Sequence, residues 1–141
     1  MKQPGLIVTL IVFIAAVSFV LAAQQEKGHT FNIQLSGATE LNTDGKGLLK
    51  LNLKPSQHKI CYELSASNVA TVSSIQVHSG GIYRVGPMVL EMKTATQDLM
   101  KGCQNLDPEL AMDIIHTPEN YCVTIVNAEF PHGALRGQIF R

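Results

Sequence analysis

The chain has 141 residues, which is enough for a single domain once any targeting segment is removed. Its 11 lysines and arginines balance its 11 aspartates and glutamates, so the formal net charge is +0. A chain without net charge has no long-range attraction for phosphate or for acidic polymers. The composition therefore argues against a nucleic-acid-binding protein.

The N-terminus has the pattern of a secretory signal peptide. Lys2 supplies a positive charge, an uncharged apolar run covers residues 6–21, and a cleavage point follows at Ala22 or Ala23. The alternative is an uncleaved membrane anchor, for which the run is slightly short because a full span needs about 20 residues. We predict a signal peptide over residues 1–22 and export to the periplasm or the extracellular space, with membrane attachment only if the segment is not cleaved.

Three cysteines follow that segment, namely Cys61, Cys103 and Cys122. In an oxidising compartment two of them can form a disulfide, and the residues alone leave all three pairings open. No Cys-x-x-Cys spacing occurs, so we do not expect the cysteines to bind a metal.

The remaining chain, residues 30–141, reads as one all-β domain. Short segments alternate apolar and polar residues and are bounded by Gly, Pro, Asn and Asp, which predicts about seven or eight antiparallel strands in a Greek-key sandwich or barrel. Strands are expected over residues 30–37, 48–54, 58–67, 73–81, 86–92, 121–130 and 133–140. One stretch differs: Asp107 is a good N-cap and Pro108 suits the first helical position, which predicts a short helix near residues 108–116.

Histidine offers the main candidate for a metal site. Copper and zinc sites need about three converging imidazoles or carboxylates. His78 with His132 or His116 is such a combination, but no two histidines have the spacing of a ligand pair, so we expect no metal and no cofactor. A Gly-x-Ser-x-Gly motif and a pair of carboxylates are both missing from the sequence, and Cys122 reads as a buried, inert thiol. We therefore predict no catalytic residue.

The C-terminal stretch FPHGALRGQIF carries an arginine inside a predicted strand. Pro131 and Gly133 predict a tight turn, and Gly137, directly after Arg136, indicates a close approach of two backbones. We expect Arg136 to hold the last strand in register by bonding across the end of the sheet, through its planar guanidinium group. The alternative is an arginine that binds an anion or a partner.

Five segments follow one another between about Phe31 and Arg141: FNIQLSGATE, ICYEL, IQVHSGGIYRVGPMVLEM, KGCQNLDPELAMDII and YCVTIVNAEFPHGALRGQI. In their order and content they resemble the CHRD domain family, chordin-type domains that also occur singly in secreted bacterial proteins. The most specific segment is the last one, and its motif consists of Pro131, Gly133, Ala134, Leu135, Arg136, Gly137, Gln138 and Ile139. The resemblance implies an immunoglobulin-like or superoxide-dismutase-like β-sandwich and a disulfide between Cys61 and Cys103.

The chain departs from the family at a set of histidines. The family typically has three of them, at positions that correspond here to Gln76, His78 and Val126, and a threonine where this chain has Asn127. Only His78 is retained, so the resemblance implies that any family metal site has been lost.

These observations predict an exported, non-enzymatic CHRD-domain protein that acts as a binding or structural module. Its partner is expected to be an unknown protein or surface. The alternative is a copper- or zinc-binding or redox protein that uses His78 with other histidines.

Overall fold

The structure is a computed structural model, and it describes residues 27–38, 44–94 and 100–141. The predicted signal peptide, residues 1–22, lies outside the described residues. Within the described part of the chain, no helix combines the length and the hydropathy that crossing a bilayer requires.

The described residues form eight strands, one α-helix and two short 3-10 helices. The strands are β1 (His29–Gly37), β2 (Lys46–Lys54), β3 (Lys59–Ser67), β4 (Val72–Gly81), β5 (Arg84–Lys93), β6 (Lys101–Asn105), β7 (Tyr121–Asn127) and β8 (Leu135–Gln138), and the helices are α2 (Pro108–His116), η2 (Pro55–Gln57) and η3 (Pro118–Asn120). The all-β prediction with one short helix is confirmed.

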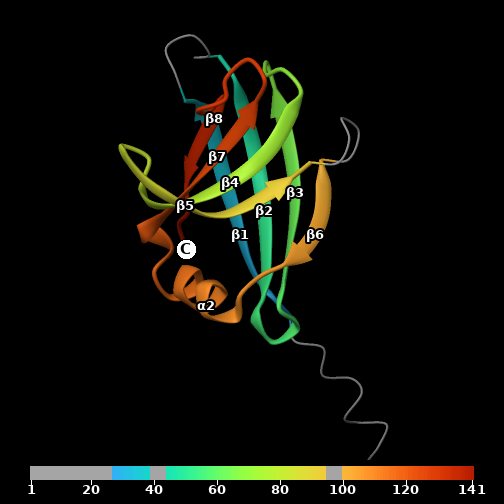
Figure 1. Cartoon of the computed structure of the whole chain (residues 1–141), viewed down its shortest axis with the longest axis vertical. Helices are drawn as coiled ribbons and strands as arrows, with labels where there is room; N and C mark the ends of the chain where they lie inside the picture. The colour runs from blue at the N-terminus through green and yellow to red at the C-terminus, as the bar shows by residue number, and fades with distance from the viewer. Residues whose placement is uncertain (1–26, 39–43, 95–99) are drawn as a thin grey trace, which may run out of the picture.

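All eight strands belong to one antiparallel sheet with the order β5-β4-β7-β8-β1-β2-β3-β6. Three neighbouring pairs, β4–β7, β8–β1 and β3–β6, are not consecutive in the chain. The sheet curls until its two edge strands approach one another (Figure 1). The side chain of Gln104 on β6 then donates to the backbone oxygen of Glu91 on β5 at 2.9 Å. The curled sheet therefore encloses its own core.

The core follows from the alternation of the strands, since every second side chain points inward. On β1, Phe31, Ile33 and Leu35 are buried while the residues between them are exposed. The same alternation on the other strands adds Leu49, Leu51, Leu53, Ile60, Leu64, Ile75, Val77, Val123, Ile125 and Leu135 to a single apolar cluster. Strand β7 differs, because all seven of its residues are buried. Both faces of β7 are therefore covered.

Helix α2 lies at one end of the curled sheet, as Figure 1 shows. Asp107 is its N-cap, and the carboxylate accepts a hydrogen bond from the backbone N–H of Glu109 at 3.0 Å. Ala111 and Ile114 face the core. The hydroxyl of Tyr121, the first residue of β7, donates to the carboxylate of Asp113. This bond attaches the helix to the sheet.

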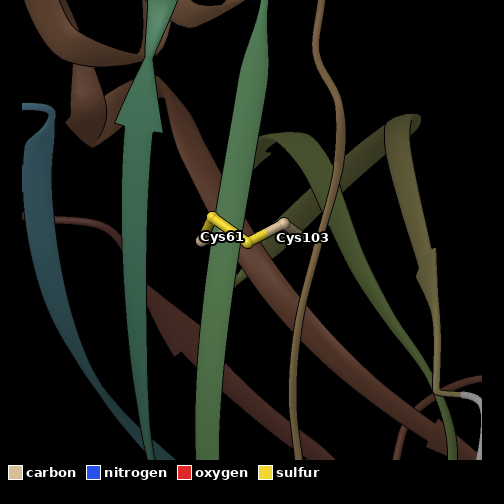
Figure 2. The surroundings of a disulfide bond; sticks show 2 residues. All are labelled: Cys61 and Cys103. Atoms are coloured by element: carbon tan, nitrogen blue, oxygen red, sulfur yellow. A yellow bond between two sulfur atoms is a disulfide. The ribbon is translucent and has the colours of Figure 1, made fainter. Parts of the chain in front are cut away.

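Strand β6 was not predicted, because Lys-Gly-Cys-Gln-Asn shows no apolar alternation. It forms through its pairing with β3, in which Cys61 lies directly opposite Cys103. The two cysteines form a disulfide, seen between β3 and β6 in Figure 2. This is the pairing that the resemblance implied, and Cys122 is left as a buried free thiol.

Candidate functional site

The most distinctive local feature is the turn between β4 and β5. The register of this hairpin shifts on both sides of His78, and Gly80 has a φ of +90°, which favours glycine. The turn at residues 82–83 projects away from the rest of the sheet (Figure 1). Tyr83 at its tip is 98% exposed. The hairpin therefore presents an aromatic side chain to solvent.

Two side chains of the last strand hold this turn. Gln138 Oε1 accepts a hydrogen bond from the backbone N–H of Ile82 at 3.2 Å. Arg136 Nη1 donates to the backbone oxygen of the same Ile82 at 3.4 Å, which is a long bond. Both backbone groups of Ile82 are thus bound from β8. We call this arrangement the Ile82 clamp.

Gln138 is itself fixed in place. Its Nε2 donates to the backbone oxygen of Tyr121 at 2.6 Å and to that of Glu119 at 3.0 Å. The amide group therefore uses both its donor and its acceptor atoms, so its orientation is determined by the surrounding backbone.

Arg136 is less completely bonded than Gln138. It lies directly opposite Thr124 in the β7–β8 pairing. Its Nε and the hydroxyl of Thr124 are both buried without a hydrogen-bond partner. Arg136 thus bonds to a backbone oxygen of the β4–β5 turn through a long contact.

Two glycines of the C-terminal motif, Gly133 in the turn and Gly137 in the strand, allow β8 to pack closely against its neighbours. Gly133 has a φ of +131°, a conformation that L side chains rarely adopt. A side chain at Gly137 would collide with the backbone oxygen of Gln34 and with Ile33 on β1. Pro131 is exposed in the turn. The motif glycines therefore permit the contacts that place Arg136 and Gln138.

His78 lies at the base of the same hairpin, and both of its ring nitrogens have partners. Nδ1 is 3.0 Å from the backbone oxygen of Gly86, and Nε2 is 3.2 Å from Oε1 of Gln76. Gln76 in turn donates to the carboxylate of Glu91 at 3.4 Å. Through these contacts His78 and Gln76 connect β4 with β5.

The other proposed ligands do not join His78. His116 is the last residue of α2, and His132 is exposed in the β7–β8 turn. Across residues 27–38, 44–94 and 100–141 there is no group of three His, Cys, Asp or Glu side chains that could hold a metal ion. The copper or zinc alternative receives no support from the described residues.

Cys122 lies directly opposite both His78 on β4 and Gln138 on β8, and it is fully buried. Burial raises the pKa of its thiol, an effect that the positive charge of Arg136 partly opposes. The thiolate is the reactive form of cysteine, so burial disfavours the reactive form of Cys122.

The sequence did not indicate the roles of Ile82, Tyr83 and Asn127. Asn127 ends β7 and accepts a hydrogen bond from the backbone N–H of Phe130 through Oδ1 at 2.7 Å, which starts the turn to β8. The double glycine before Ile82 was a usable signal for the β4–β5 turn, because glycine adopts the positive φ that tight turns require, as Gly80 does.

Comparison with known proteins agrees with this architecture. A sequence model of the CHRD domain matches residues 31–139, which is most of the chain and contains all eight strands apart from the first two residues of β1. A search of curated proteins and a search of solved structures each found no match. On the strength of the match over residues 31–139, the chain belongs to the CHRD domain family.

Proposed function

We propose that this CHRD domain is an exported, non-enzymatic binding module, and that its β4–β5 turn contacts a protein partner. The observation that carries the proposal is the combination of a fixed backbone and an exposed aromatic side chain. Both backbone groups of Ile82 are bonded by the clamp, while the neighbouring Tyr83 is 98% exposed. Such a side chain does not stabilise the fold that holds it.

Exposed tyrosines on rigid elements are effective contact residues. Tyrosine offers a large apolar ring and a hydroxyl group, loses little conformational entropy on binding, and is enriched among residues that dominate interface energies. The same hairpin also exposes Met88 and Val89 on β5, at 49% and 37%.

Two further observations support export and a non-enzymatic role. The Cys61–Cys103 disulfide is partly exposed and is the kind of bond that persists in oxidising compartments. Three polar side chains near the hairpin, namely His78, Gln76 and Gln138, are engaged in bonds that hold it. None of them is arranged as a nucleophile with a base.

Photo-crosslinking of the exported protein in its own host tests this proposal. A photoreactive phenylalanine derivative replaces Tyr83 in one variant and Phe140, which is 65% exposed near the C-terminus, in a control variant. We expect a discrete protein adduct from position 83 and none of the same mass from position 140. Identical adducts from both positions, or no adduct from position 83, would contradict the proposal.

A second variant separates recognition from folding. Tyr83→Ser should no longer bind the partner that crosslinking identifies, as measured by pull-down of that partner. Its melting temperature should be unchanged, because an exposed side chain contributes little to stability. Full capture by Tyr83→Ser would show that the partner binds elsewhere.

A further inference from the structure

The outer face of β1, β2, β3 and β6 is strongly basic, although the whole chain is neutral. The alternation that buries Leu49, Leu51 and Leu53 turns the neighbouring side chains of these strands to the opposite face. Lysines occupy this face at Lys46, Lys50 and Lys54 on β2, Lys59 on β3 and Lys101 on β6. Glu63 is the one acidic residue within these four strands. We call this surface the lysine face.

Apart from Glu63 and Asp44, which comes two residues before Lys46, the acidic residues of the described chain lie elsewhere. Asp107, Glu109 and Asp113 belong to the start and the exposed side of α2, and Glu119 and Glu129 flank β7. The net charge of zero therefore hides the fact that positive and negative residues lie in different parts of the fold. The lysine face can attract acidic polymers, although the overall composition argued against such an attraction.

The arrangement of the lysines is unfavourable for the isolated domain. Lys54 and Lys59 lie directly opposite one another in the β2–β3 pairing, and like charges in that position destabilise a sheet. Glu63 lies between Lys50 and Lys101 and offsets part of their charge. No acidic residue of these strands offsets the repulsion between Lys54 and Lys59. A bound anion would relieve it.

The face also contains a hollow that can receive part of a ligand. This open depression has a volume of about 700 Å³ and is lined by Lys27, Lys50, Lys54, Thr30 and Asn52, among others. Asn52 Nδ2 donates to the hydroxyl oxygen of Thr30 at 2.7 Å, which leaves the hydroxyl hydrogen of Thr30 free to bond to a ligand. The hollow thus offers three ammonium groups and a hydroxyl donor.

We propose that the lysine face binds an acidic polysaccharide, with its carboxylate or sulfate groups at the lysines and its hydroxyls at the uncharged polar side chains. Lys46, Lys50 and Lys54 are each four residues apart on one strand, so neighbouring charges are about 13–14 Å apart. A polymer that carries one charge every second sugar suits such a wide spacing. Beside the lysines, the outward positions of β1 and β3 carry hydroxyl and amide side chains that can exchange hydrogen bonds with sugar hydroxyls, namely Thr30, Asn32, Gln34, Ser36, Ser65 and Ser67. Leu48, between Lys46 and Lys50, is the exposed apolar residue of the face.

The same residues make other polyanions poorer ligands. Duplex DNA carries one charge per ~1.7 Å of its axis and is bound mainly through densely placed Lys and Arg contacts. Single strands need aromatic side chains on which bases can stack, and the outward positions of these four strands contain none.

Affinity chromatography and titration of the mature, disulfide-bonded protein with defined polymers test this proposal. The probes are hyaluronate, which carries one carboxylate every second sugar, chondroitin sulfate, which adds a sulfate to a similar repeat, and neutral dextran. We expect binding to at least one charged polymer, no binding to neutral dextran, and release at about 1 M salt, where the Debye length falls to about 3 Å. The charged polymer that binds more tightly identifies the anionic group.

Matched variants locate the site. Lys50→Gln with Lys54→Gln removes two charges from the lysine face, and Arg84→Gln with Lys93→Gln removes two exposed charges from β5. We expect the first pair to weaken binding about tenfold or more and the second pair to leave it nearly unchanged. Equal losses in the two pairs, no binding by the wild-type protein, or tighter binding to duplex DNA or to anionic lipid vesicles would overturn the proposal.

Discussion

Gln138 on the last strand accepts a hydrogen bond from the backbone N–H of Ile82, 56 residues earlier in the chain, at 3.2 Å. The same amide donates to the backbone oxygen of Tyr121 at 2.6 Å. One side chain therefore connects the tip of the β4–β5 hairpin to the start of β7. Gln138 of the C-terminal motif thus has a structural role, which its position in the sequence does not reveal.

Replacing Gln138 should cost more stability than replacing Arg136. Gln138→Ala leaves the part-buried N–H of Ile82 without its acceptor and removes the donor to the backbone oxygens of Tyr121 and Glu119, and we expect the free energy of unfolding to fall by about 2 kcal/mol. Arg136→Lys loses one long bond and also removes the unpaired Nε, so a loss of about 1 kcal/mol is expected. Urea unfolding curves of the two variants check this order, and a larger loss for Arg136→Lys would contradict it.

Gly137→Ala should be among the most damaging small substitutions in the domain. Its new methyl group would meet the backbone oxygen of Gln34, which cannot move without separating β8 from β1. We expect a loss of about 3 kcal/mol, measured by thermal or urea unfolding. The control is Gly81→Ala, whose methyl group would meet only the end of the Gln138 side chain, at 3.2 Å. Similar losses for the two variants would show that close approach is not what Gly137 provides.

The Cys61–Cys103 disulfide closes a loop of 42 residues that contains β4 and β5. In the chain-entropy account a loop of this length contributes about 4 kcal/mol. The double variant Cys61→Ser with Cys103→Ser should therefore unfold at much lower urea concentration than the wild type. Cys122→Ala, which keeps the disulfide, is the control and should lose less. An unchanged midpoint in the double variant would refute this role.

The bond between Tyr121 and Asp113 makes stability depend on pH in the alkaline range. Burial, and then the hydrogen bond and negative charge of Asp113, raise the pKa of Tyr121 to about 12. The folded state holds its phenolic proton more tightly than the unfolded state, whose pKa is about 10. The stability from this group is therefore complete below pH 10 and is lost as the pH rises from about 10 to about 12.

Tyr121→Phe isolates this effect. The difference in unfolding free energy between wild type and Tyr121→Phe should shrink as the pH rises from about 10 toward about 12. Tyr83→Phe, which changes an exposed tyrosine, is the control and should differ from wild type by the same small amount throughout. A constant difference for Tyr121→Phe would mean that its hydroxyl does not bond to Asp113 in solution.

Much of the fold was predictable because it depends on local patterns. Alternation placed seven of the strands, and Asp107 and Pro108 placed the helix at residues 108–116. Strand ends were less accurate: β7 ends at Asn127 rather than at residue 130, because Asn127 bonds to the next turn. Strand β6 was missed because its formation depends on the pairing with β3, not on its own residues.

The candidate sites were less predictable because they depend on contacts between distant segments. The motif around Arg136 was recognised, but nothing in it indicates that the partner is Ile82. The lysine face was hidden by the neutral composition, since opposite charges lie in different parts of the fold. Only the register of β2, β3 and β6 shows that Lys50, Lys59 and Lys101 share one surface.

The central claim is that β8 fixes the turn that presents Tyr83, and amide hydrogen exchange at Ile82 tests it most directly. In the wild-type protein the Ile82 N–H should exchange slowly, because it is bonded to Gln138 Oε1. In Gln138→Ala it should exchange much faster, while amides within β2 remain protected. Fast exchange of the Ile82 amide already in the wild-type protein would contradict the claim.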